Sequence, residues 1–191
     1  MMSEIGFALT GSFCTFERAI EQMKILRTAG HNVTPIMSFH AYNLDTKFGK
    51  AADFNKKIED VCQNKIIHTI QNAEPIGPQK MFDILIIEPC SGNTLAKLAA
   101  GIVDTPVLMA AKSHLRNARP LLLGVSTNDA LGNSAKNIGF LMNIKNIYFI
   151  PLGQDDIYRK PRSIVADFKL TEAAFHAALN GVQLQPIIKS Y

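Results

Sequence analysis

Cysteine is scarce in this sequence, and its distribution argues against several classes of protein. The three cysteines, Cys14, Cys62 and Cys90, are odd in number and far apart, and no C-x-x-C pair occurs. A disulfide framework needs paired cysteines, and a structural zinc site usually needs closely spaced ones. The pattern therefore indicates a reducing compartment, and we predict no metal site.

Long apolar runs and blocks of like charge are also missing. No run approaches the roughly 18 apolar residues of a membrane span. Residues 1–5 have no basic region followed by an apolar one, so we expect no signal peptide. The net charge of +4 is spread along the chain, without the basic block of a nucleic-acid arm. We therefore expect a cytoplasmic protein whose partners include neither membranes nor nucleic acids.

The chain does contain a regular alternation of apolar runs and helical spacing. Its 191 residues, of which 47% are hydrophobic and 19% charged, suit a single domain over residues 1–191. Short apolar runs predict strands at residues 5–9, 31–37, 84–88, 120–126 and 146–151. Apolar spacing predicts helices at 16–29, 50–63, 64–72, 95–102, 107–114, 135–142 and 171–180, with loops at 38–49, 74–78 and 153–162. This order predicts a doubly wound α/β fold with a mostly parallel sheet.

Single residues add detail to this prediction. Pro35 has no N–H group, so it either places the second strand at an edge of the sheet or lies near that strand's end. Thr171 is predicted to cap the last helix, and Gly181 to end it.

The stretch from Asp83 to Leu98 is the centre of the predicted fold. An apolar run breaks at Pro89, passes through small polar residues and resumes with helical spacing at Leu95. We predict that Asn93 or Thr94 caps this helix. A strand, a tight turn and a helix start place N–H groups and the positive end of the helix dipole where an anion can bind.

Small or polar residues follow four of the predicted strands. They are Gly11-Ser12, Ser38, Ser91-Gly92-Asn93-Thr94 and Ser126-Thr127-Asn128. Ligands of open α/β sheets bind at this edge, and hydroxyl, amide and N–H groups with few carboxylates suit a phosphate. The first turn is not G-x-G-x-x-G and no acidic residue ends the second strand, which disfavours a dinucleotide. The residues alone leave two alternatives: a mononucleotide site, or an ordinary α/β domain whose turns cap helices.

One of these turns carries a family resemblance. Residues 89–94, Pro-Cys-Ser-Gly-Asn-Thr, resemble the Pro-Ala-Ser-Ala-Asn-Thr motif of the flavoprotein family that contains cysteine and phosphopantothenoylcysteine decarboxylases and flavin prenyltransferases. The Gly11-Ser12 turn and Ser38 match other landmarks of that family in order. Runs at residues 73–78, 89–98, 108–112, 126–132 and 153–156 resemble the dipicolinate synthase B subunits.

The resemblance implies a three-layer αβα, Rossmann-like flavoprotein fold with FMN as cofactor. It implies a cofactor site formed by Gly11, Ser12, Phe13, Ser38, Cys90, Ser91, Gly92, Asn93 and Thr94. The FMN phosphate is expected at the first turn and at the helix start. Cys90 is either redox-active or a small buried thiol. Asn128 and Asp129 either orient and deprotonate the substrate, or form an Asx turn that caps the next helix.

The same resemblance implies a function shared with a partner. Dipicolinate synthase B subunits act with a nicotinamide-dependent A subunit, which uses NADP, to oxidise dihydrodipicolinate to dipicolinate during sporulation. This implies a location in the mother cell and, by analogy with relatives, a homo-oligomer of three or more copies. Lys112, His114 and Arg116 could bind the dicarboxylate substrate, or simply complement a helix dipole. The charged run at 155–162 either closes over the site or is a solvated loop.

The sequence departs from the decarboxylases at two motifs. Residues 74–78 lack the His that precedes the motif strand in those enzymes, and residues 125–131 keep only Asn128 of their Pro-Ala-Met-Asn-x-x-Met motif. Phe13 is also bulkier than the small residue usual at its position. Decarboxylation of a cysteinyl substrate is therefore not expected. Three functions remain open: a flavin-binding partner in an oxidoreductase, a non-catalytic scaffolding or binding component, and a free-standing enzyme such as a prenyltransferase.

Overall fold

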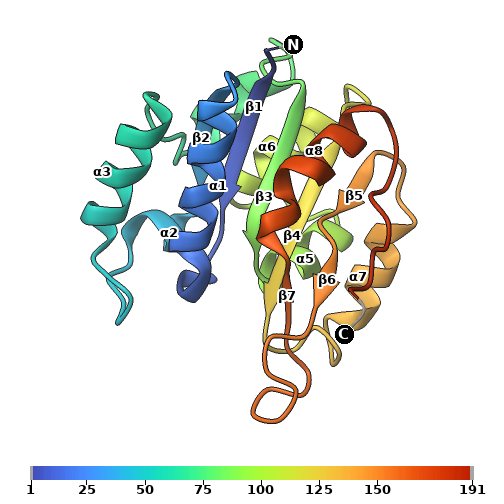
Figure 1. The fold of residues 1–191 in the computed structure, drawn as a ribbon. Coiled ribbons are helices and arrows are strands. Elements are labelled where there is room, and N and C mark those ends of the chain that lie inside the picture. The colour runs from blue at the N-terminus through green and yellow to red at the C-terminus, as the bar shows by residue number, and fades with distance from the viewer. Residues whose placement is uncertain (1, 190–191) are drawn as a thin grey trace.

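The computed structural model describes residues 2–189 of the chain, and a mostly parallel sheet of seven strands forms its middle layer (Figure 1). The strands are β1 Glu4–Leu9, β2 Asn32–Met37, β3 Ile84–Cys90, β4 Leu121–Thr127, β5 Ile147–Phe149, β6 Leu152–Gly153 and β7 Ile164–Ala166. They lie in the order β2-β1-β3-β4-β7-β6, and β5 also pairs with β4. Since β1 to β5 pair in parallel, their carboxyl ends meet at one edge, at the bottom of Figure 1, which we call the carboxyl edge.

Helices cover both faces of this sheet. They are α1 Phe16–Thr28, α2 Phe39–Asn43, α3 Ala51–Cys62, α4 Ile70–Ala73, α5 Gly92–Ala99, α6 Pro106–Leu115, α7 Ala135–Met142 and α8 Thr171–Leu179. Three short 3-10 turns are η1 Phe13–Thr15, η2 Glu74–Ile76 and η3 Phe168–Leu170. In Figure 1, α1 and α8 lie in front of the sheet, and α5 and α6 lie behind it. The predicted three-layer αβα fold is therefore confirmed.

The core is densest around β3, whose seven residues are all buried. A strand covered on both faces needs a continuous apolar run, which residues 84–87 supply. Gly6 on β1 fits a close approach, because a Cβ atom there would lie 2.6 Å from the Phe82 ring. Pro35 lies on β2 at the end of the strand order, which confirms the first of the two alternatives, an edge position.

The central strand runs further than the sequence predicts. β3 continues through Pro89 to Cys90, which pairs with Val125 of β4, so the predicted break at Pro89 is wrong. The register between the two strands shifts between Ile87 and Cys90. A local irregularity of this kind accommodates a residue that has no N–H to donate.

Short elements account for the other differences. The predicted loop 38–49 contains α2, the predicted helix 64–72 is reduced to α4, and the loop 74–78 contains η2. β6 and β7, on either side of the charged run, were not predicted. The helix α8 begins at Thr171, but its N-cap is Leu170, so the predicted capping role of Thr171 is wrong. Elements this short do not show a full hydrophobic period in the sequence, so tertiary contacts determine whether they form.

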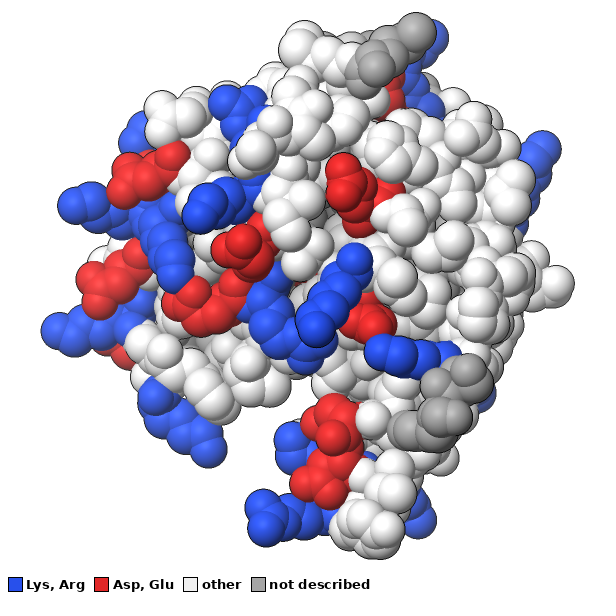
Figure 2. Space-filling view, viewed as in Figure 1, with Lys and Arg blue, Asp and Glu red and all other residues white. Residues whose placement is uncertain are grey.

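Charged side chains are distributed unevenly over the face seen in Figure 2. They gather over α1 and α3 and on the loop at the bottom, whereas the side near β5 is mostly uncharged. The surface is hollowed at the bottom, between the body and the loop 154–163. Within residues 2–189, no helix combines the length and the apolar character needed to cross a membrane.

Candidate functional site at the carboxyl edge

Three strand ends are tied together at the carboxyl edge. The hydroxyl of Ser12, after β1, lies 2.8 Å from the hydroxyl of Ser126 on β4. Thr10 donates its hydroxyl proton to the Pro89 carbonyl at 2.8 Å and accepts the Ser91 N–H at 2.9 Å. The turn after β1 is therefore fixed against the ends of β3 and β4, as expected for residues that follow parallel strands.

The start of α5 lies at the same edge. Ser91 is its N-cap, and the Ser91 Oγ atom accepts the Thr94 N–H at 3.4 Å. The prediction that Asn93 or Thr94 caps the helix is therefore wrong, because Ser91 is the residue with the extended backbone that a cap requires. The N–H groups of Gly92 and Asn93 lie in the first turn, where no helix carbonyl accepts from them, so they remain available to an anion.

Gly92 allows α5 to approach the loop after β4. A Cβ atom at this position would lie 2.7 Å from Thr127 Oγ1, 2.9 Å from Asp129 Oδ1 and 2.9 Å from Ser134 Oγ. All three distances are shorter than a Cβ atom tolerates. A glycine is therefore required for the helix start and the β4 loop to form one wall.

A first hollow, of about 430 Å³, opens beside this helix start. Its lining residues are Gly11, Ser38, Phe39, His40, Ser91, Asn93, Thr94, Lys97, Asp104, Thr105 and Leu108. Five of the predicted cofactor residues are among them. Lys97 supplies a cation, which forms a 2.6 Å ion pair with Asp104 at the rim.

A second hollow, of about 580 Å³, shares Gly11 and Ser91 with the first. Its lining residues are Gly11, Ser12, Phe13, Cys14, Lys47, Phe48, Ser91, Gly92, Ser126, Thr127, Asn128, Asp129, Asp155, Lys160 and Val165. The structure thus brings the predicted residues Ser12, Phe13 and Gly92 together with the predicted pair Asn128 and Asp129.

Asn128 and Asp129 face this second hollow while also shaping their own loop. The Asp129 Oδ1 atom accepts the Thr127 hydroxyl at 2.6 Å and the Ser134 hydroxyl at 3.0 Å. The Asn128 Oδ1 atom accepts the Ser163 hydroxyl at 3.5 Å. Asp129 therefore holds its loop through two side-chain hydroxyls, but the N-cap of α7 is Ser134, so neither residue caps that helix, and both line the hollow.

The three cysteines differ in access. Cys90 is fully buried and lines neither hollow, and burial raises the pKa of its thiol well above the usual range. A buried thiol without a lowered pKa is unreactive, which supports the second of the two predicted alternatives. Cys14, which the sequence did not single out, is exposed and lines the second hollow.

The basic cluster after α6 does not form a dicarboxylate site. The His114 side chain is buried and donates its Nε2–H to the Pro120 carbonyl at 2.9 Å. Burial lowers the pKa of His114 to about 4, so the ring is neutral at pH 7. Lys112 lines a separate apolar hollow formed by α5 and α6. The dicarboxylate alternative for Lys112, His114 and Arg116 is therefore not supported, because the histidine turns into the protein, whereas the position of Lys112 and His114 in the last turn of α6 agrees with the dipole alternative.

Two other lysines, Lys47 and Lys160, supply positive charge at the second hollow. Lys160, in the charged run for which closure over the site was one of two alternatives, lines this hollow and pairs with Asp155 at 3.2 Å. Lys47 comes from the segment after α2, separated from the end of β2 by that helix, so no pattern in the sequence indicates it. Residues 2–189 contain no cluster of three or more His, Cys, Asp or Glu side chains placed to hold a metal ion.

Comparison with known proteins assigns the family. A family model described as flavoprotein matches residues 2–173. The chain is 47% identical over 184 residues to the dipicolinate synthase B subunit of Bacillus subtilis (strain 168), covering 96% of this chain and 92% of that protein.

Solved structures agree with this assignment. The crystal structure of the dipicolinate synthase B subunit from Bacillus halodurans C matches with a TM-score of 0.90 and 42% identity, over 98% of this chain and 96% of that chain. Burkholderia xenovorans DmrB in complex with FMN matches with a TM-score of 0.68 and 17% identity, over 92% of this chain and 94% of that chain, which shows the fold alone. The chain therefore belongs to the flavoprotein family, and it is similar over almost its whole length to dipicolinate synthase B subunits.

Proposed function

We propose that this chain is the flavin-binding B subunit of a dipicolinate synthase. It binds FMN at the carboxyl edge and acts with a nicotinamide-dependent A subunit to oxidise dihydrodipicolinate to dipicolinate. The observation that carries the proposal is the convergence of the ends of β1, β2 and β3 on one polar hollow, in a chain with near full-length similarity to B subunits.

The two hollows suit FMN in size and in donor chemistry. Their volumes, about 430 and 580 Å³, are typical of ligand sites. The first offers the hydroxyls of Ser38 and Ser91, the N–H groups at the start of α5, and Lys97, a set that suits a phosphate. We assign the phosphate to the first hollow and the flavin ring to the second, where Phe13 supplies an aromatic surface.

The residues of the second hollow bind and orient the substrate. FMN, when bound, supplies hydride or electron transfer. The Asn128 amide can donate to a substrate carboxylate. The Oδ1 atom of Asp129 already accepts two hydrogen bonds, which leaves Oδ2 to accept a proton from the substrate.

The proton and the hydride that the reaction releases are taken up by this chain and by the A subunit, respectively. Oxidation of dihydrodipicolinate releases the equivalent of one hydride and one proton. We assign the proton to Asp129 and the final hydride acceptor to NADP on the A subunit. The proposal includes a homo-oligomer of three or more copies and a cytoplasmic location in the mother cell of a sporulating bacterium.

Reconstitution of the purified chain with its A subunit, with and without FMN, tests this function. We expect a yellow preparation with flavin absorbance, and dipicolinate formation that requires both proteins and FMN. A chain that neither binds FMN nor restores activity overturns the proposal. A colourless chain that still raises the rate of the A subunit supports a scaffolding role, and activity of this chain on its own supports a free-standing enzyme.

A further inference from the structure

Glu88 is an acidic residue in the centre of the sheet that the proposed reaction does not use. It lies on β3 immediately before Pro89, and its side chain is completely buried. Gly124 on β4 leaves room for it, since a Cβ atom at Gly124 would lie 2.9 Å from Glu88 Cγ. Glu88 is the one carboxyl side chain among residues 2–189 that is buried.

The hydrogen bonds around Thr171 determine where the protons lie. The Thr171 Oγ1 atom is 2.7 Å from the Phe168 carbonyl oxygen and 2.8 Å from Glu88 Oε2. A hydroxyl has one proton to donate, and a carbonyl oxygen can only accept. If Thr171 donates to Phe168, the second short contact needs a proton from Glu88. This arrangement requires the carboxylic acid form of Glu88.

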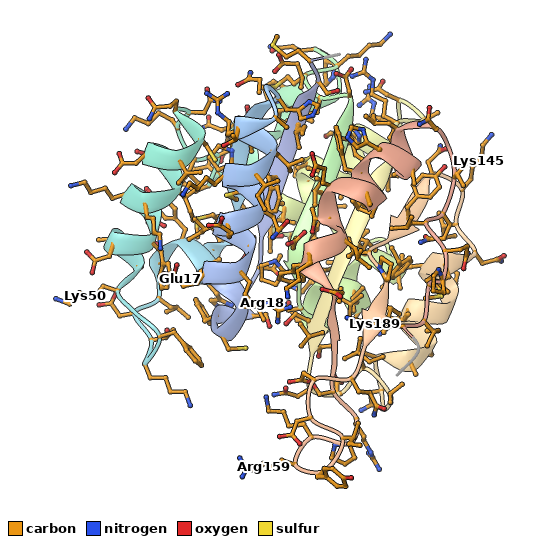
Figure 3. All side chains as sticks on the ribbon, in the orientation of Figure 1. Glu17, Arg18, Lys50, Lys145, Arg159 and Lys189 are labelled. Carbon is orange, nitrogen blue, oxygen red and sulfur yellow. The ribbon has the colours of Figure 1, made fainter. Side chains whose placement is uncertain are left out.

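The other surroundings of Glu88 favour the same form. Its Oε1 atom has no hydrogen-bond partner within the described residues, which a neutral carboxyl tolerates better than a carboxylate. Burial raises the pKa of Glu88 well above the usual range and outweighs the lowering by the Thr171 hydroxyl contact and by the charge of Arg18. Arg18 lies between α1 and α8 in Figure 3, exposed, with its guanidinium 4.9 Å from the centre of the Phe168 ring.

Three elements present groups to Glu88. β4 presents Gly124, α8 presents Thr171 and α1 presents Arg18, while the Phe168 carbonyl of η3 contacts Thr171. Arg18 is the charged member of this set, and no hydrogen bond joins it to Glu88 within the described residues. The surroundings therefore offer the carboxyl group no direct charged partner that would hold it ionised.

Glu88 is also connected to the candidate site. Pro89, the next residue, accepts the Thr10 N–H at 3.2 Å and the Thr10 hydroxyl at 2.8 Å through its carbonyl oxygen. Ser91, two residues further on, caps α5. The bond to Thr171 therefore anchors the end of β3 to α8, directly before the turn that begins the first hollow.

We propose that Glu88 is an uncharged carboxylic acid that donates a hydrogen bond to Thr171 and so positions the Pro89–Ser91 turn. The role in positioning a flavin site rests on the proposed function. The assignment of the proton does not, and it can be tested on the chain without FMN.

The pH dependence of unfolding tests the proton. The unfolded chain releases the Glu88 proton near pH 4.3, whereas the folded chain keeps it to higher pH. Between these values the folded state binds one more proton, so stability falls as pH rises. Between pH 5 and 7, the folding constant of the wild type relative to Glu88→Gln should fall about tenfold per pH unit. Glu21→Gln, at an exposed position on α1, is the control and should leave the wild-type slope unchanged. A ratio of wild type to Glu88→Gln that does not change with pH overturns the proposal.

Infrared spectroscopy of the wild type tests the proton without a variant. At pH 7 we expect the carbonyl stretching band of one protonated carboxyl group. Its absence overturns the assignment even if Glu88→Gln fails to fold.

FMN titration tests the positioning role. Glu88→Gln keeps a donor for Thr171 and should bind FMN within about twofold of the wild type. Glu88→Ala removes that donor, and we expect a dissociation constant about tenfold higher, the size of one lost hydrogen bond. Equal affinity of Glu88→Ala and the wild type overturns the positioning role. A wild type that binds no FMN refutes the proposed function, while the results on the proton still hold.

Discussion

The two edges of the parallel sheet use similar polar side chains in opposite ways. At the carboxyl edge, hydroxyl, amide and carboxylate groups line two hollows. At the opposite edge, where the parallel strands begin and which we call the amino edge, such groups bind backbone carbonyls. His114 donates to the Pro120 carbonyl at 2.9 Å, and Asn117 donates to the Gly77 carbonyl at 2.8 Å. Arg119 likewise donates to backbone carbonyls before β3.

Position relative to the strands, rather than residue type, therefore decides whether polar side chains line the two hollows. The amino-edge side chains satisfy backbone acceptors that would otherwise be buried without partners. Changes at the carboxyl edge should weaken FMN binding, whereas changes at the amino edge should lower stability and leave binding intact.

The largest effect is expected from Gly92→Ala at the carboxyl edge. The new methyl group would lie 2.7 Å from Thr127 Oγ1 and 2.9 Å from Asp129 Oδ1, so the wall that the helix start and the β4 loop form at the second hollow must shift. We expect a loss of about 1–3 kcal/mol in the free energy of unfolding, and FMN affinity lowered by about a hundredfold. Flavin fluorescence titration and urea unfolding measure both. Gly139→Ala on α7, where nothing lies within 4 Å of the new atom, is the control and should stabilise the helix slightly. Unchanged FMN affinity in Gly92→Ala would contradict the position of the site.

The next effect is expected at the amino edge, from the titration of His114. Its pKa is lowered to about 4 by burial, so the folded state keeps the ring neutral where the unfolded chain binds a proton. Stability should therefore fall as the pH drops from about 6.5 to about 4, by about 3 kcal/mol in total. The His114→Gln variant should lack this part of the acid-side slope in urea unfolding, with FMN affinity at pH 7 unchanged. Parallel acid slopes in the two proteins would show that His114 is accessible to protons.

One helix cap that lines the first hollow and one that lines neither hollow give a smaller, matched pair. Ser91→Ala removes the cap of α5. Thr69→Ala removes the cap of α4, where the Thr69 hydroxyl accepts the Asn72 N–H at 3.2 Å. Each should lose about 1 kcal/mol of stability. Only Ser91→Ala should also raise the FMN dissociation constant, by about tenfold, because its hydroxyl lines the first hollow. Equal FMN affinity in the two variants would refute the assignment of the phosphate.

The smallest change in stability is expected from Lys160→Met. Its ion pair with Asp155 is exposed, so the free energy of unfolding should change by less than about 0.5 kcal/mol. The KM for the dicarboxylate substrate should rise several-fold in the reconstituted enzyme, because the second hollow loses a cation. Lys145→Met, a surface lysine between α7 and β5 (Figure 3), is the matched control and should leave the KM unchanged. A KM that is equal in both variants would separate Lys160 from substrate binding.

Local pattern was sufficient to predict the central elements of this fold. The apolar runs of β1, β3 and β4 and the helical spacing of α1 and α3 are long enough to show their period. The rule that ligands bind at the carboxyl ends of parallel strands then predicted that residues 11–12, 38 and 91–94 lie near one another. The family resemblance supplied the chemical identity of the expected ligand.

The remaining features depend on contacts that a local pattern does not contain. β7 has three residues and exists through its pairing with Ser126 and Thr127 on β4. His114 faces inward because the Pro120 carbonyl needs a donor, which sequence spacing does not show. The contact between Glu88 and Thr171 joins residues 83 positions apart, so neither residue indicates the other.

The branching of the sheet at β4 separates the loop 154–163, which can vary, from the turns of the parallel strands, which must stay. β4 pairs with β5 in parallel over its first residues and with β7 in antiparallel fashion at its end, so the β6–β7 hairpin lies outside the parallel core (Figure 1). A change in the length of the 154–163 loop is inexpensive, since doubling a flexible loop costs about 0.6 kcal/mol. Evolution or protein engineering can therefore exchange this loop, and with it one wall of the second hollow, while the turns of the first hollow are kept. The fold thus combines turns fixed by the parallel core with one exchangeable loop within a single chain.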